Sequence, residues 1–131
     1  MLALHLAAGW RCEELRVEVT RQATVLPDHA QPGFDLLKVD VEGAAASVLA
    51  SVDLAAWRPR AIVIEATVPL TSRPSHNEWE PDVLAAGCEL ALFDGLNRFY
   101  ARDDEPELRE RFSAPANYIP YRWAVRLSLE V

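Results

Sequence analysis

Two segments of the chain have the apolar patterning of strands that belong to one sheet. Asp35 to Gly43 reads Asp-Leu-Leu-Lys-Val-Asp-Val-Glu-Gly, in which apolar and polar residues alternate over most of the length. Ala61 to Thr67 reads Ala-Ile-Val-Ile-Glu-Ala-Thr, and its β-branched run is typical of a strand buried on both faces. We therefore expect two strands, the first of which ends at Gly43.

Helices are expected before, between and after these strands. The Ala- and Leu-rich stretch 44–52 predicts one helix, and a shorter helix is expected at 22–29. A third helix should end just before Gly87, because glycine is favoured directly after a helix. Its start is left open: Ser75 could form a capping box with Glu78, whereas Pro81 favours a start nearer Glu80.

The second half of the chain contains a strong hairpin signal. The segments 88–93 and 98–102 flank Asp-Gly-Leu-Asn at 94–97, a composition that favours a tight turn between antiparallel strands. A short charged helix is expected at 106–112. Alternation at Glu14 to Thr20 indicates a further short strand or extended segment.

The order of these elements predicts the fold class. Strands that alternate with helices form parallel, right-handed crossovers covered on both faces, whereas a four-residue loop can join only antiparallel strands. The chain is therefore expected to be α/β, with a mixed sheet of parallel strands and a closing antiparallel hairpin.

Size and charge narrow the possible functions. The chain has 131 residues, enough for one domain, and a formal net charge of -7. This charge argues against a nucleic-acid or anionic-membrane partner, and no stretch is long and apolar enough to span a bilayer. Cys12 and Cys88 form no disulfide or metal pattern, so we expect a reducing, cytoplasmic setting.

Three carboxylates are the candidates for chemistry. Asp40 and Glu42 lie at the end of the first strand and Glu65 near the end of the second. Adjacent parallel strands would bring them to one edge of the sheet, where open α/β sheets bind ligands. There they could hold a divalent cation, orient a hydroxyl or accept its proton. The alternative is a structural network in which they pair with arginines: Arg58, Arg60 and Arg98.

Two further residues have a structural and a functional interpretation. Gly43 permits a positive φ angle or the close approach of a ligand, although a plain turn is the more frequent reason for a glycine. Trp79 has helical spacing from Val83, which favours a core position over a substrate platform.

The sequence resembles the FkbM-type methyltransferases. The segment Leu36 to Ala44 (Leu-Leu-Lys-Val-Asp-Val-Glu-Gly-Ala) is similar to their central signature. A later series follows in the same order, from Ile64-Glu65-Ala66-Thr67 through Trp79-Glu80-Pro81 and Gly87 to the segment 93–100. The resemblance extends over residues 17–118.

This resemblance implies a class I, Rossmann-like methyltransferase fold, with an antiparallel strand near one edge of the sheet. It also implies S-adenosylmethionine as cofactor and a hydroxyl of a small molecule or sugar as methyl acceptor. Asp40 or Glu42 would then act as base or cation ligand, Glu65 as supporting acid, and Gly43 beside the cofactor.

The sequence also departs from the family pattern. It contains no Gly-x-Gly, which the cofactor loop of the fold would require, and Ala45 occupies a position where the family usually has an acid. We therefore expect residues 1–118 to be the C-terminal half of a methyltransferase domain without its N-terminal cofactor half, and 119–131 to be a tail.

Such a half-domain would have an open sheet edge and would seek a partner. We expect a homodimer or association with the missing half. The alternative function is a non-catalytic α/β remnant that serves as an interaction module.

Overall fold

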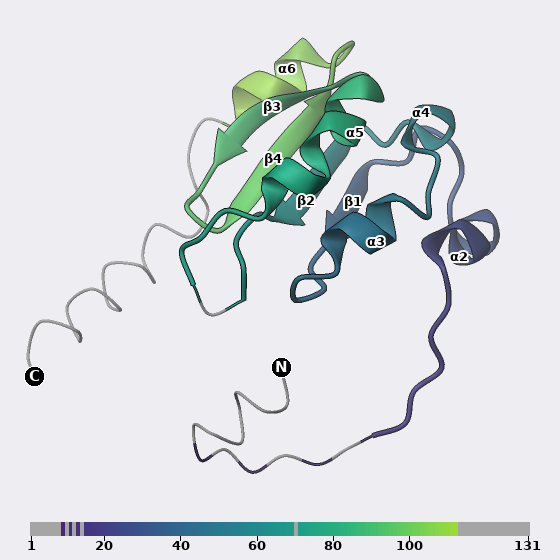
Figure 1. The fold of residues 1–131 in the computed structure, drawn as a ribbon. Helices are drawn as coiled ribbons and strands as arrows, with labels where there is room; N and C mark the ends of the chain where they lie inside the picture. Colours follow the sequence, from purple (N-terminus) through teal and green to yellow (C-terminus); the bar gives the residue numbers. More distant parts are fainter. Residues whose placement is uncertain (1–8, 10, 12, 14, 70, 113–131) are drawn as a thin grey trace, which may run out of the picture.

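The computed structural model describes residues 9, 11, 13, 15–69 and 71–112, which form a mixed four-stranded sheet with short helices packed on it (Figure 1). The strands are β1 (Leu36–Val39), β2 (Ala61–Glu65), β3 (Cys88–Phe93) and β4 (Asn97–Arg102). The helices are α2 (Gln22–His29), α3 (Ala45–Leu49), α4 (Leu54–Trp57), the 3₁₀ turn η1 (His76–Glu78), α5 (Glu80–Ala85) and α6 (Pro106–Arg111). No helix in the described part of the chain is long and apolar enough to cross a membrane.

The sheet confirms the mixed α/β architecture expected from the sequence. Its strand order is β1-β2-β4-β3, with β1 and β2 parallel and β4 antiparallel to both of its neighbours. The second strand of the hairpin thus inserts beside β2 and leaves β3 at the outer edge. A bulge between Leu90 and Leu92 shifts the pairing of β3 with β4.

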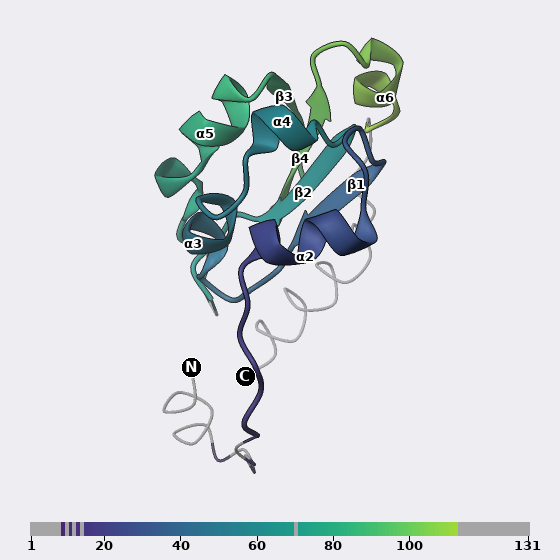
Figure 2. The same cartoon turned by 90° about the vertical axis from the view of Figure 1, so that its right-hand side faces the viewer.

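One face of the sheet carries the hydrophobic core. The pairs Leu37↔Ile62 and Val39↔Ile64 place these four side chains on the same face, and all are buried. Helices α3, α4 and α5 cover this face, and Leu26 of α2 joins the core from the side of β1 (Figure 2). On the opposite face, Phe99 of β4 packs against Phe112 after α6, with ring centroids 5.7 Å apart.

The link between α3 and β2 contains a helix that the sequence pattern did not reveal. The carboxylate of Asp53 accepts a hydrogen bond from the N–H of Ala56 at 3.0 Å and caps the single turn of α4. Arg58 then adopts a left-handed conformation (φ 44°) that ends the helix. The sequence did not predict α4, because four residues are too few to display a helical period.

Several expected boundaries differ from those observed. β1 ends at Val39 rather than Gly43, and residues 15–20 form no strand. Their apolar side chains are instead highly exposed, as at Val19 (88%). α5 starts at Glu80, and Ser75 makes no capping hydrogen bond, so the capping-box interpretation was wrong. The helices at 22–29 and 106–111 agree with prediction, whereas the tail predicted at 119–131 lies outside the described residues.

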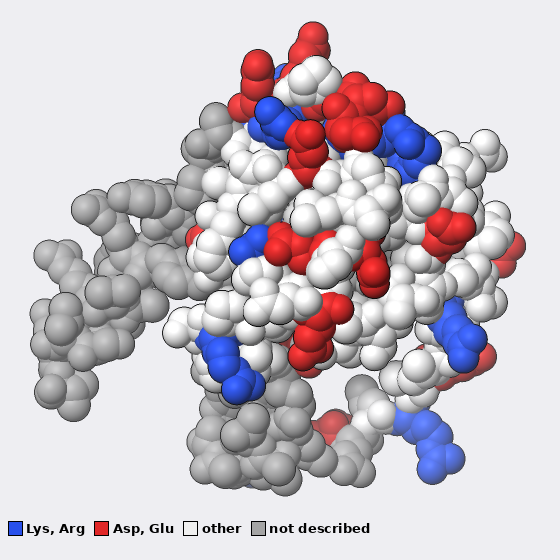
Figure 3. Space-filling view, turned by 45° about the horizontal axis from the view of Figure 1, so that its top comes forward, with Lys and Arg blue, Asp and Glu red and all other residues white. Residues whose placement is uncertain are grey.

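A network of paired charges closes the end of the sheet where β1 and β2 begin. Arg60 donates to Glu105 at 2.6 Å and to Asp35 at 2.9 Å, and Arg58 donates to Asp104 at 3.1 Å. Arg102 pairs with both Asp104 and Glu105. Figure 3 shows acidic and basic side chains mixed on this side of the molecule. We call this set of residues (Asp35, Arg58, Arg60 and 102–105) the paired end.

Candidate functional site

A tight turn after β1, from Val41 to Ala44, holds one of the predicted carboxylates, that of Glu42. Ala44 N–H donates to the carbonyl of Val41 at 3.2 Å, which makes Glu42 and Gly43 the central residues of the turn. Both have positive φ, 48° for Glu42 and 90° for Gly43. This conformation suits glycine but is unfavourable for glutamate, and such backbone strain concentrates at functional sites. A Cβ at Gly43 would approach Pro69 no closer than 3.5 Å, so the conformation is the reason for glycine here, not a lack of space.

The chain leaves β2 through Glu65 and folds back on itself. Thr67 forms an isolated antiparallel bridge with Pro74, and Ser75 N–H donates to the carbonyl of Ala66 at 2.8 Å. Val68 N–H in turn donates to the carbonyl of Arg73 at 2.8 Å. These backbone bonds hold the start of η1 beside the carboxyl end of β2.

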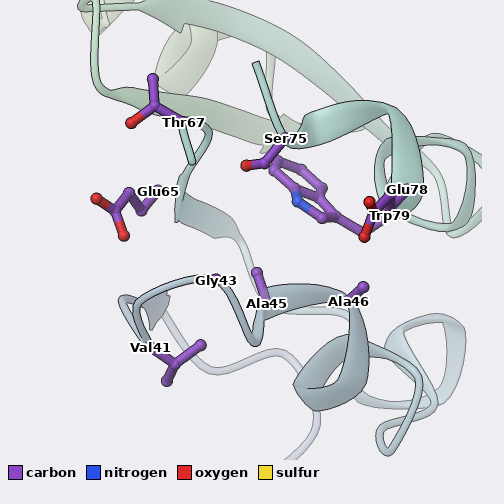
Figure 4. Close-up of a pocket in the computed structure, with 9 residues that line it drawn as sticks. All are labelled: Val41, Gly43, Ala45, Ala46, Glu65, Thr67, Ser75, Glu78 and Trp79. Atoms are coloured by element: carbon purple, nitrogen blue, oxygen red, sulfur yellow. The ribbon is translucent and has the colours of Figure 1, made fainter. Parts of the chain in front are cut away.

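The ends of the two parallel strands and the start of η1 enclose a small hollow (Figure 4). Its cavity volume is about 20 Å³, room for roughly one water molecule, so the hollow is small. Glu65 and Thr67 lie on one side and the residues around η1 on the other, with the turn and α3 below. The lining residues are Val41, Gly43, Ala45, Ala46, Glu65, Thr67, Ser75, Glu78 and Trp79.

Trp79 forms one wall of the hollow and is also part of the core. It is 2% exposed and packs edge-on against Tyr100, with centroids 6.1 Å apart and an interplanar angle of 75°. The core position expected from its spacing is therefore confirmed. Its indole Nε1 is buried and has no hydrogen-bond partner in the described structure.

Among the three predicted carboxylates, Glu65 is the one whose pKa is raised by its surroundings. Partial burial raises its pKa above the ordinary 4.5, and the negative charges of Glu42 and Asp40 raise the pKa further. The positive charge of Lys38 acts in the opposite direction. All three predicted carboxylates are thus near enough to interact electrostatically at the carboxyl end of the two strands.

The structure brings the predicted carboxylates together by a route other than strand alternation. Asp40 and Glu42 both lie beyond β1, and the turn, not an extended strand, directs the side chain of Glu42. Both are exposed, whereas Glu65 is half-buried. Lys38 donates to Asp40 at 2.6 Å and forms an ion pair with it.

The alternative network with arginines is not observed. Arg58 and Arg60 belong to the paired end, where β1 and β2 begin, at the opposite end of the strands from the hollow. Arg98 pairs instead with Glu80, whose carboxylate also accepts a hydrogen bond from Tyr100 Oη at 2.8 Å. Burial and this charged acceptor raise the pKa of Tyr100 well above its ordinary range. The sequence could not show which acid each arginine binds, because the partners are far apart along the chain.

Sequence reasoning missed the residues that enclose the hollow from the side of η1. Ser75 was considered only as a helix cap, and Glu78 only as its partner, yet both line the hollow. The available signal was the Trp-Glu-Pro segment at 79–81, part of the family resemblance, placed soon after a loop that follows a strand end.

The described residues contain no group of three or more His, Cys, Asp or Glu side chains arranged to hold a metal ion. The divalent cation considered from the sequence stays a prediction. So do the catalytic roles of Asp40, Glu42 and Glu65 and the cofactor contact of Gly43.

Comparison with known proteins agrees with the resemblance read from the signature. Residues 4–90 match the model of the methyltransferase FkbM domain, which includes both parallel strands and the residues lining the hollow. The match starts and ends earlier than the 17–118 drawn from motifs. No curated protein and no solved structure matches the chain at a significant level. Since the matched segment is well over half of the chain, the protein belongs to the FkbM methyltransferase domain family.

Proposed function

We propose that this chain forms the acceptor side of an O-methyltransferase site, where the hydroxyl of a small molecule or sugar loses its proton as it is methylated. The observation that carries the proposal is the raised pKa of Glu65 at the wall of the hollow, beside two further carboxylates. A base whose pKa lies closer to neutral pH removes a hydroxyl proton more effectively than an ordinary carboxylate.

The cofactor of the family, S-adenosylmethionine, supplies the methyl group on a sulfonium when bound. The residues of the hollow fit only the reacting end of this molecule. The carboxylates of Glu65 and Glu78 suit a positively charged sulfonium. The described residues offer no glycine-rich loop for its remaining parts. We propose that a separate cofactor-binding half holds them.

The roles proposed for the carboxylates follow from their positions. Glu65 lines the hollow, whereas Asp40 and Glu42 do not. Glu65 therefore orients the acceptor hydroxyl and accepts its proton, while the other two carboxylates keep its pKa high through their charge. This reverses the order of roles expected from the sequence, in which Asp40 or Glu42 was the base. Thr67 and Ser75 supply hydroxyls that can bind further oxygens of the acceptor.

The decisive experiment compares two variants with amide substitutions, one single and one double, in an active family member that carries the same three carboxylates. Glu65→Gln should lower the rate of labelled methyl transfer by about 10²–10⁴-fold, the usual contribution of a general base. Asp40→Asn with Glu42→Gln should instead shift the pH–rate profile to lower pH, because the pKa of Glu65 falls. Turnover unchanged by Glu65→Gln would refute the assignment.

A second experiment tests the division of the site. If this chain supplies only the acceptor side, calorimetry of the 131-residue protein with S-adenosylmethionine should detect no binding. Micromolar affinity would show that the chain holds the cofactor by itself, and the proposed division would be wrong.

One observation favours an additional role in association. β1 is an edge strand among the described strands, and its first residue, Leu36, is 55% exposed. Unpaired strand edges recruit other strands. We propose that this edge pairs with a second copy or with a cofactor-binding half. Light scattering that finds a monomer at high concentration would argue against the homodimer.

A further inference from the structure

The indole N–H of Trp79 has no acceptor although it is buried. Nε1 is one of three buried side-chain polar atoms without a hydrogen-bond partner in the described structure. A buried donor that loses its water and gains no partner destabilises the fold, so such atoms are uncommon and require a reason. The ring is fixed by its contact with Tyr100 and cannot turn toward solvent without disrupting the core.

The nitrogen faces the hollow and not the core. Figure 4 shows the Nε1 edge of the indole turned toward the space between Ser75 and Ala45. The opposite wall consists of small residues, Gly43, Ala45 and Ala46. The Cβ of Ala45 points toward the indole and carries no polar atom that could accept the hydrogen bond.

We propose that Trp79 Nε1–H is a ligand-binding donor that takes an oxygen of the methyl acceptor. The inference rests on the proposed function, because it assigns the acceptor a second point of contact opposite Glu65. A hydroxyl donates to the carboxylate of Glu65, and a neighbouring oxygen of the same molecule accepts from the indole. Trp79 thus positions the acceptor and takes no part in the proton transfer.

The charge of the site restricts this acceptor to a neutral polyol. Glu65 and Glu78 line the hollow, and Asp40 and Glu42 lie close to its edge. An ionised carboxylate or phosphate on the ligand would be repelled by these carboxylates. Among the groups that shift the pKa of Glu65, Lys38 is the basic one that would offset this repulsion. A neutral molecule with adjacent oxygens can donate a hydrogen bond to Glu65 and accept one from Trp79 without this repulsion.

The test observes the indole proton directly and requires no methyl transfer. The chain has four tryptophans, so ¹⁵N-indole labelling gives few signals, and Trp79→Phe assigns that of Trp79. Methyl α-glucopyranoside and myo-inositol are the neutral probes, and glucuronate is the matched anion. The signal of Trp79 should move downfield on titration with a neutral probe, that of Trp57 should stay, and glucuronate should have no effect.

Two variants separate the N–H from the ring. Benzothienylalanine at position 79 retains the bicyclic shape but replaces the N–H by sulfur, and it should weaken binding of the neutral probe about three- to tenfold, the effect of one neutral hydrogen bond. Ala45→Glu brings an internal acceptor to the same edge. It should move the Trp79 signal downfield without any probe and abolish the response to titration.

The outcomes distinguish this inference from the proposed function. No movement of the Trp79 signal up to molar probe, or equal affinity in the benzothienylalanine variant, overturns the inference and leaves Nε1 a buried donor that no ligand uses. A probe-dependent shift together with unchanged turnover in Glu65→Gln supports the donor role and refutes the base.

Discussion

The acidic residues at the two ends of the sheet differ in how they are paired and in the direction in which their pKa values are shifted. At the paired end, Asp35, Asp104 and Glu105 each lie within 3.1 Å of an arginine nitrogen. At the other end, where β1 and β2 finish, Lys38 pairs with Asp40, is itself 50% exposed, and is the basic residue that acts on the pKa of Glu65. We call this end, with Asp40, Glu42 and Glu65, the unpaired end. The arginines lower the pKa of Asp104 and Glu105, whereas the pKa of Glu65 is raised.

This difference separates structural from functional charge. Paired charges satisfy one another, so they join distant segments and have little capacity left for a ligand. Carboxylates held near one another without enough cations raise the folded-state free energy, and a fold retains such a cost where a ligand or a reaction uses it. The strained φ of Glu42 falls at the same unpaired end.

The largest expected effect is the loss of one arginine from the paired end. Arg102 is only 17% exposed and binds Asp104, Glu105 and the carbonyl of Arg58. Arg102→Met should lower the free energy of unfolding by about 1–3 kcal/mol, because charged hydrogen bonds are lost and their acceptors remain. Urea unfolding measures this. The matched control is Lys38→Met at the unpaired end, which should change stability by less than about 1 kcal/mol. Equal losses would abolish the contrast between the ends.

Replacing glutamate by glutamine should change the stability of the protein in opposite directions at the two ends. At neutral pH, Glu105→Gln should lower the midpoint of thermal unfolding, because its carboxylate is stabilised by Arg60. Glu65→Gln should raise it by the equivalent of less than about 1 kcal/mol, since a partly buried like charge is removed. A destabilising Glu65→Gln would mean that the Glu65 carboxylate has a stabilising partner in the fold.

The pH dependence of the two variants should differ in a defined way. Glu105 has a folded pKa below 4.5, so its stabilisation is present above that pH and is lost as pH falls through the folded value. Glu65 has a folded pKa above 4.5, so its penalty is absent below that pH and develops as pH rises through the folded value. Unfolding followed from about pH 3 to about pH 8 should show both variants converging on the parent protein in acid. A difference for Glu65→Gln that grows toward low pH would contradict the raised pKa.

Much of the fold was predictable because its signals are local. The β-branched run at 61–65, the Asp-Gly turn and the glycine at 87 each depend on residues adjacent in sequence, and each element formed where expected. The position of β4 between β2 and β3 was not specified, because a hairpin signal gives pairing within the hairpin and not the side on which it docks. The helix at 54–57 is too short to give a period.

The site was predictable only in part for a related reason. Parallel strands bring their carboxyl ends together, so the meeting of Glu65 with the turn after β1 followed from fold class alone. The contribution of Ser75 and Trp79 depends on how the loop 68–74 folds back, through backbone hydrogen bonds that leave no pattern in the sequence. The unpartnered indole nitrogen of Trp79 likewise depends on which atoms lie across the hollow.

The smallest expected effect is the response to salt, which tests whether the contrast is electrostatic. Raising the salt concentration from about 0.01 M to about 1 M shortens the screening length from about 30 Å to about 3 Å. The stabilisation gained by Glu65→Gln should shrink, because the repulsion from Asp40 and Glu42 that it removes is already screened. The loss caused by Arg102→Met should persist for the most part, since its hydrogen bonds are direct contacts made by a largely buried side chain. Paired unfolding curves at the two salt concentrations measure both differences. A salt-independent gain in Glu65→Gln would attribute the raised pKa to burial alone, and the unpaired end would then be three neighbouring acids without mutual influence.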